Sequence, residues 1–163
     1  MTGLLRLILA LGFAVALSQF PAFSDQYVQR LGGQADALQK VAAEFDASAD
    51  RAGLTRQAAA LEELAGTQFL DSHGQDMGRV FTRLARIESD LGLLRSASAL
   101  ERIALPHRMR DAETLAATWG DFRPALPLTA AGFWATGLGF LLGWMIGGLL
   151  ARLFRREEQD SWT

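Results

Sequence analysis

Charge-poor, apolar stretches lie near both ends of the chain, and the segment between them mixes apolar and charged residues at helical spacing. The C-terminal stretch, residues 125–151, contains no charged residue and is bounded by Arg123 and Arg152. A helix of that length reaches roughly 40 Å, which exceeds the hydrocarbon core of a bilayer at about 30 Å. The pattern predicts a C-terminal transmembrane helix over residues 125–151.

The N-terminal stretch, residues 4–23, is the second candidate membrane segment. Its strongly apolar part, residues 7–17, is as short as the core of a secretory signal peptide, and residues 16–18 form an acceptable cleavage site. Residues 20–23 extend the apolar surface beyond that site, which favours a retained transmembrane helix. Cleavage is the alternative, and the following segment emerges on the same side of the membrane in either case.

Residues 24–123 show the spacing of a soluble helical domain. Apolar residues recur at alternating steps of four and three over residues 25–50 and again from residue 77, which is typical of helices that pack along a seam. The pattern breaks at residues 72–74, which predicts a loop there. Two such seams favour an antiparallel helical hairpin or small bundle, and no stretch alternates with period two, so the predicted fold class is all-α. The first seam comprises Leu31, Ala35, Leu38, Ala42, Phe45 and Ala49, and the second comprises Met77, Val80, Leu84, Ile87, Leu91 and Leu94.

Residues with capping properties mark the helix ends of this domain. Gly53 is placed to cap the C-terminus of the first helix, and Thr55 the N-terminus of the next. Ser98 and Glu101 form a capping-box pattern, and Asp111 can cap a further short helix.

Small residues form a stripe on the C-terminal membrane segment, where Gly139, Gly143 and Gly147 recur every four residues. Such a stripe lets another helix approach closely, and packing in lipid favours it. Two interpretations stay open: the stripe packs against the N-terminal segment of the same chain, or it joins copies in a homo-oligomer. A pore is disfavoured, since neither segment carries a charge in its middle. The matching small residues of the N-terminal segment are Gly12 with Ala16, and likewise Ala10 with Ala14.

Aromatic residues flank the two membrane segments on the side of the central domain. Phe20 and Tyr27 lie at the end of the first segment, and Trp119 and Phe122 precede the second. Aromatic side chains are enriched at headgroup depth, so we predict these four as membrane-surface anchors. A collar that binds a partner at the membrane surface is the alternative.

Basic residues in the short flanks set the predicted orientation. Arg152, Arg155 and Arg156 follow the second segment, and the terminal amine and Arg6 lie before the strongly apolar part of the first, residues 7–17. By the positive-inside rule both termini are cytoplasmic, with residues 152–163 as a cytoplasmic tail. We then expect the central domain on the opposite side of the membrane, which is the periplasm if the membrane is the inner membrane of a Gram-negative bacterium.

Composition narrows the function classes. The chain carries 16 basic and 18 acidic residues, with no basic cluster outside the C-terminal tail, so nucleic acid is not an expected partner. It has no cysteine, which excludes disulfides, thiolate zinc sites and iron–sulfur clusters.

No catalytic constellation can be recognised. The two histidines, His73 and His107, have no second ligand at helical metal-binding spacing, and Asp71 and Asp76 near His73 suggest a solvated loop more than a divalent site. No serine lies in a nucleophile elbow, and no glycine-rich loop follows a strand. The sequence predicts a protein that is not an enzyme, with no catalytic residues, metal or cofactor.

Several motifs carry a family resemblance. They read LSQFPAF at residues 17–23, QY at 26–27 followed by QRLGG at 29–33, FD at 45–46 and WGDFRPALPLT at 119–129. With these the chain resembles a family of uncharacterised proteobacterial inner-membrane proteins, known as a domain of unknown function, over nearly its whole length. The resemblance implies membrane placement and a mature protein that keeps the Ser-Gln-Phe-Pro segment, but it implies no mechanism.

The function predicted from the sequence is an envelope interaction or scaffold role. In this hypothesis the membrane helices localise the protein, and the heptad helices bind an unidentified envelope protein. The alternative is a small oligomeric channel or transporter subunit that assembles through the glycine-rich face. The expected partners are membrane lipid, a second copy of the chain or an envelope protein.

Overall fold

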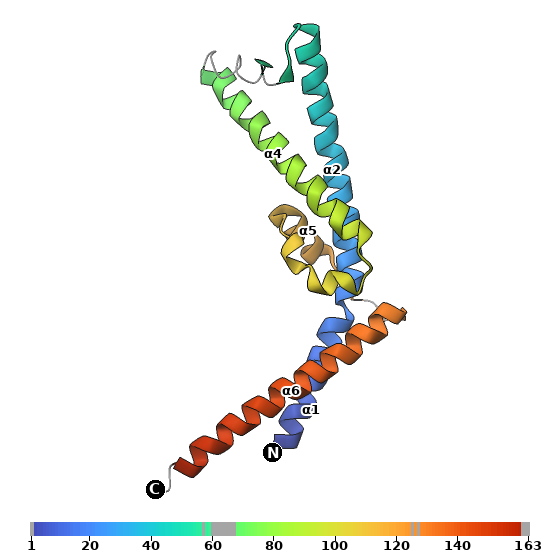
Figure 1. Ribbon diagram of the computed structural model, residues 1–163, viewed down its shortest axis with the longest axis vertical. Helices are drawn as coiled ribbons and strands as arrows, with labels where there is room; N and C mark the ends of the chain where they lie inside the picture. Colours follow the sequence, from blue (N-terminus) through green and yellow to red (C-terminus); the bar gives the residue numbers. More distant parts are fainter. Residues whose placement is uncertain (1, 57, 60–67, 125, 127, 161–163) are drawn as a thin grey trace. The chain divides into compact units, whose positions relative to one another are not determined.

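The computed structural model describes residues 2–56, 58–59, 68–124, 126 and 128–160, and every regular element in these ranges is helical (Figure 1). The prediction of an all-α fold with a candidate membrane helix at each end is therefore confirmed. The elements are α1 (Thr2–Ser18), α2 (Phe20–Arg51), α4 (Gln68–Ser96), the 3-10 turns η1 (Glu101–Ala104) and η2 (Pro106–Arg108), α5 (Ala112–Asp121) and α6 (Ala130–Asp160).

The chain divides into two compact units. The terminal unit consists of residues 1–26, 97–106 and 118–163, and the central unit consists of residues 27–96 and 107–117. Each unit is therefore assembled from segments that are distant in the sequence, and each is described by itself below.

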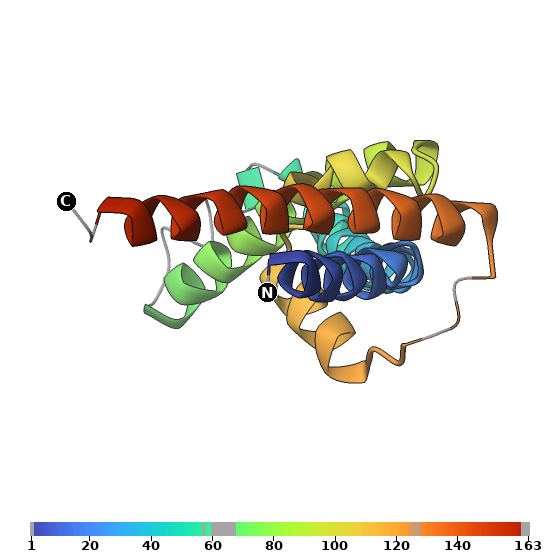
Figure 2. The ribbon, with the colours of Figure 1, turned by 90° about the horizontal axis from the view of Figure 1, so that it is seen from below.

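In the terminal unit, α1 and α6 lie side by side and run in opposite directions (Figures 1 and 2). Two helical stretches, Gly3–Arg51 and Ala130–Arg152, are long and apolar enough to cross a membrane. Large apolar side chains on both helices point away from the pair, among them Leu4 at 66% exposure and Trp134 at 68%. Such surfaces suit a lipid environment, since water would disfavour them.

The helical boundaries of these segments differ from the predicted spans. Helix α1 ends at Ser18, short of the predicted end at residue 23, and α2 begins at Phe20. Pro21 explains the break, because it has no amide hydrogen and its ring opposes the carbonyl four residues earlier. At the other end α6 begins at Ala130, and Ala125, the predicted start of the second span, lies outside the described residues, as do residues 161–163 of the predicted tail.

The central unit is built around the two predicted seams. Helices α2 and α4 run antiparallel (Figure 1), as predicted for a hairpin. Phe45 and Phe81 meet edge to face with ring centroids 5.4 Å apart, and Gln39 Nε2 donates to Glu88 Oε1 at 2.7 Å. The buried seam residues are Leu31, Ala35, Ala42 and Ala49 on α2, and Met77, Leu84, Ile87, Leu91 and Leu94 on α4.

The loop predicted at residues 72–74 is wrong, because α4 begins at Gln68 and continues through this stretch. Gly74 is buried one turn before Met77, so it extends the packed face of the helix. A glycine weakens an isolated helix by about 1 kcal/mol, but packing along the seam outweighs that preference here.

The predicted caps around Gly53 are confirmed. Gly53 has φ 73°, and the amide of Leu54 donates to the carbonyl of Ala49 at 2.9 Å, which is the bond of a Schellman motif. Thr55 Oγ1 accepts from the amide of Ala58 at 3.2 Å and so caps the start of the next helical turn.

Candidate functional site

The glycine stripe of α6 is covered by α1 of the same chain. At three glycines an added Cβ would lie less than 3 Å from the backbone of α1, a distance that real side chains do not adopt. The stripe is therefore a row of notches into which the α1 backbone fits, as expected for close helix packing in lipid. The added Cβ would lie 2.9 Å from Ala14 Cα at Gly139, 2.7 Å from Ala10 Cα at Gly143 and 2.8 Å from Arg6 Cα at Gly147.

On α1, the face that meets the glycines carries Ala10 and Ala14, which are 0% and 6% exposed. Gly12 and Ala16, the other predicted pair, are exposed, and an atom added at Gly12 would meet nothing within 4 Å. The prediction that Gly12 and Ala16 lie at the helix-packing interface is therefore wrong, and Ala10 and Ala14 lie there instead. The physical reason is that a step of two residues turns about 200° around a helix, so only one of the two stripes can face α6.

The predicted membrane-surface aromatics separate into two environments. In the terminal unit Phe23 packs edge to face on Trp119 and Phe122, with ring centroids 5.8 and 5.4 Å apart. Trp119 is 75% exposed and Phe20 is half-buried, so both can meet lipid headgroups. Phe23, whose ring contacts both of these aromatic side chains, was not among the predicted anchors. Its position had indicated only the apolar end of the first predicted span.

Tyr27 is a correction to the predicted anchors. Its side chain is 0% exposed in the central unit, and its hydroxyl accepts a hydrogen bond from the amide of Asp111 at 3.2 Å. A side chain without exposed surface has no contact with headgroups. Tyr27 is therefore a core residue that fixes the start of α5 to α2.

Asp111 is a carboxylate of the central unit that accepts several hydrogen bonds. It accepts from Arg83 Nε at 3.0 Å and Nη2 at 2.9 Å, and from the amide and hydroxyl of Thr114 at 3.1 and 2.8 Å. The predicted N-cap of α5 is thus confirmed. Burial favours the protonated acid and raises its pKa, but the bonds from Arg83 and Thr114 outweigh burial, so the pKa of Asp111 is below its usual value.

Asp90 is the second buried carboxylate, with 4% side-chain exposure. Its oxygens accept from Arg108 Nη1 at 3.2 Å and from Arg110 Nε at 2.7 Å. These two guanidinium groups pair with one carboxylate of α4, and so they attach η2 and the residues just after it to that helix. Like those of Asp111, the oxygens of Asp90 already accept hydrogen bonds from arginines, which makes this carboxylate a poor general base.

The predicted capping box holds the connection between α4 and α5. The amide of Ser98 donates to Glu101 Oε2 at 2.7 Å, and the amide of Glu101 donates to Ser98 Oγ at 3.3 Å. Within the terminal unit Arg102 forms an ion pair with Asp25, which attaches η1 to the first turns of α2.

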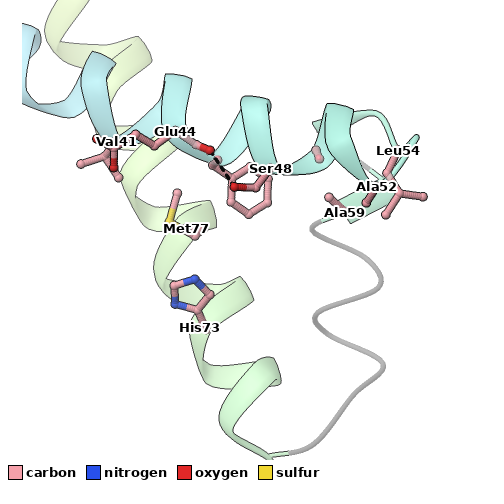
Figure 3. Close-up of a pocket in the computed structure, with 10 residues that line it drawn as sticks. Val41, Glu44, Ser48, Ala52, Leu54, Ala59, His73 and Met77 are labelled. Atoms are coloured by element: carbon pink, nitrogen blue, oxygen red, sulfur yellow. Dashed lines mark hydrogen bonds between the residues drawn. The ribbon is translucent and has the colours of Figure 1, made fainter.

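An open groove of about 460 Å³ lies between the C-terminal half of α2 and the first turns of α4 (Figure 3). Its lining is mainly apolar, from Val41, Phe45 and Met77, with His73 at one side. Asp76 near His73 is paired with Arg79. Among the described residues no three His, Asp or Glu side chains are grouped as a metal would require.

Taken together, these elements define a class: an all-α protein whose terminal helices can cross a membrane and whose polar clusters join helices to one another. The chain belongs to the family described as "Protein of unknown function (DUF2937)", whose sequence profile matches residues 1–159. Neither the curated proteins nor the solved structures returned a match.

Proposed function

We propose that the protein is an integral inner-membrane protein that presents its central helical unit in the periplasm, as an interaction or scaffold module of the envelope. The observation that carries the proposal is the α1–α6 pair. Its inner face is closed by glycine notches, and its outer faces are large and apolar. A soluble protein would expose such faces to water at a considerable loss of free energy.

The same pairing supports retention of the N-terminal segment. Cleavage after residue 18 would remove α1 and leave the glycine notches of α6 without their partner. With α1 retained, Arg6 at its start and Arg152 on α6 line the same hollow and so belong to the same end of the helix pair. Basic residues at that end favour the cytoplasmic side for both termini.

The central unit suits binding better than catalysis. Asp111 and Asp90, both buried, accept hydrogen bonds from arginines, and an apolar groove opens between α2 and α4. Val41 in this groove is 41% exposed, and Phe45 and Met77 line the groove with it. An apolar groove between two helices is a common seat for an amphipathic helix of a partner protein.

The alternative, an oligomeric channel or transporter subunit, loses its main argument. It required the Gly139, Gly143 and Gly147 face to join protomers, and that face packs against α1 of the same chain. No other observation favours a pore.

Reporter fusions test the orientation. Alkaline phosphatase fused after Gly53, which lies in an exposed turn, should be active, and green fluorescent protein fused after residue 156 should fluoresce. The first reporter requires the periplasm and the second folds in the cytoplasm. An inactive phosphatase after Gly53, or the chain in the soluble fraction after lysis, would contradict the proposal.

Site-specific photocrosslinking tests the interaction role. A crosslinker at Val41, inside the groove, should give a reproducible adduct with one envelope protein in intact cells. A crosslinker at Leu93, which is similarly exposed at 43% but lies outside the groove, is the matched control and should not give it. Equal yields from both positions would count against the groove.

A further inference from the structure

A second hollow, of about 500 Å³, lies on the terminal unit where the start of α1 meets the last turns of α6 before Arg152. It was not predicted from the sequence, because it requires residues from both ends of the chain. Its lining includes Arg6 from α1 and Leu142, Trp144, Met145, Gly148, Leu149 and Arg152 from α6.

The lining changes character along α6. Leu142, Met145 and Leu149 give an apolar wall, and Arg152 follows as the helix leaves its uncharged stretch. From Leu142 to Arg152 the helix rises about 15 Å, roughly half the thickness of the hydrocarbon core. An apolar wall that ends in positive charge complements a molecule with a hydrocarbon chain and an anionic head.

Arg6 is held in this hollow by the glycines of α6. A Cβ at Gly147 would lie 2.8 Å from Arg6 Cα, and one at Gly148 would lie 3.2 to 3.3 Å from the guanidinium atoms. Because neither glycine has a side chain, there is room for Arg6 at this position. Its Nε is buried without a hydrogen-bond partner in the described part of the chain, and none of the described lining residues is acidic.

We propose that this hollow binds an anionic glycerophospholipid of the cytoplasmic leaflet, with the headgroup phosphate between Arg6 and Arg152. A guanidinium matches two phosphate oxygens at once, and an acceptor there would satisfy the buried donor of Arg6. Trp144, at 42% exposure, stacks on Phe140 with ring centroids 6.2 Å apart and lines the path of the acyl chain. Basic hollows between membrane helices on the cytoplasmic side are typical anionic-lipid sites.

The lipid site rests on the proposed membrane placement of α1 and α6. The membrane placement and the lipid site can fail separately. A wrong membrane placement would be detected by the reporter fusions. A wrong lipid site would be detected only in the membrane-extracted protein, which would then show no preference for anionic headgroups.

Native mass spectrometry of the full chain tests the site. The protein is extracted into neutral detergent with equal amounts of phosphatidylglycerol, cardiolipin and phosphatidylethanolamine. We expect anionic lipids to be retained over phosphatidylethanolamine by about tenfold, and R6Q and R152Q each to reduce this ratio about fivefold. Arg123→Gln is the matched control, because this exposed arginine flanks the other end of α6, and it should leave the ratio unchanged.

Two further arms make the result decisive. R6K with R152K keeps both charges without the planar fork, so it should retain part of the selectivity and report a folded protein. Inorganic phosphate added to the delipidated chain should not raise its melting temperature as phosphatidylglycerol does. Equal retention by the wild type and R6Q, or an equal effect of inorganic phosphate alone, would overturn the assignment.

Discussion

Asp111 connects three elements through its side chain and its backbone amide. It caps α5 through Thr114, pairs with Arg83 on α4, and its own amide donates to Tyr27 on α2. Because the carboxylate is only 7% exposed, its partners are largely shielded from water and cannot be replaced by solvent without loss. Much of the polar cohesion of the central unit therefore depends on this residue.

Asp111→Ala should lower the free energy of unfolding by about 2–3 kcal/mol, because it removes a cap and leaves Arg83 partly buried without its main partner. Glu113→Ala is the control: Glu113 also pairs with Arg83 but is 75% exposed, so its loss should change stability by less than about 1 kcal/mol. Urea titration of the full chain in neutral detergent, followed by circular dichroism, measures both. Equal effects would show that burial of Asp111 contributes nothing.

Lowering the pH should remove the contribution of Asp111 to the free energy of unfolding. The pKa of Asp111 is lower in the folded state than in the unfolded chain, so its stabilisation is present above the unfolded value of about 3.9 and is lost as pH falls through the lower, folded value. The difference in melting temperature between the wild type and Asp111→Asn should therefore narrow below about pH 4. A difference that stays constant from pH 7 to pH 3 would contradict the assignment.

At the level of single residues, the helix caps could be predicted from the sequence, whereas the burial of a side chain could not. The caps at Gly53, Thr55, Ser98 and Asp111 depend on a residue and its near neighbours, and all were found as predicted. The burial of Tyr27 depends on a residue 84 positions away, to which the local pattern gave no clue.

Among the helices, the two glycines with the clearest opposite roles belong to the α2 region. Gly53 ends the helix with φ 73°, a conformation that other residues adopt only with strain, whereas Gly33 lies within α2, where an added Cβ meets nothing within 4 Å. Gly53→Ala should destabilise the protein by about 1 kcal/mol, and Gly33→Ala should stabilise it by about 0.5–1 kcal/mol. Shifts of the urea midpoint in the same direction would refute this distinction.

The contact between α1 and α6 gives a test with a built-in control. Gly143→Leu places a side chain where the backbone of α1 lies, and should destabilise the pair by about 2 kcal/mol or more. Gly137→Leu, on the same helix with open space around it, should be tolerated. Thermal unfolding in detergent, followed by tryptophan fluorescence, compares the two variants. Equal tolerance would show that the helices do not pack through the glycine face.

At the level of elements, periodicity predicted the seams of α2 and α4 but not every helix boundary or contact face. The helix through residues 72–74 persists because tertiary packing outweighs weak propensity. The sequence could not show which face of α1 packs against α6, since Ala10 with Ala14 and Gly12 with Ala16 are equivalent in spacing and similar in size. Only the fit against α6 distinguishes them.

The molecule as a whole is assembled from interleaved segments. The terminal unit needs residues from both ends of the chain, so α1 cannot pack until α6 has been synthesised. An isolated α6 therefore presents its glycine notches without a partner.

A peptide of residues 128–155 should self-associate in a genetic reporter of membrane-helix dimerisation, because its notches then accept a second copy. Gly143→Leu should reduce the signal several-fold, and the full chain should give little signal, since α1 already occupies the face. Strong association of the full chain that survives Gly143→Leu would point to a different interface.

The hydrogen bond between the Asp111 amide and Tyr27 brings the first residue of the central unit close to its last segment, residues 107–117. A body whose entry and exit coincide can be removed and the gap bridged by a few residues without separating what remains. The central unit is thus a detachable cassette: a variant in which a short glycine-serine bridge replaces residues 28–110, and which therefore also lacks residues 97–106 of the terminal unit, should keep its two apolar helices paired through the glycine face of α6. Other helical cassettes could be grafted onto the same base.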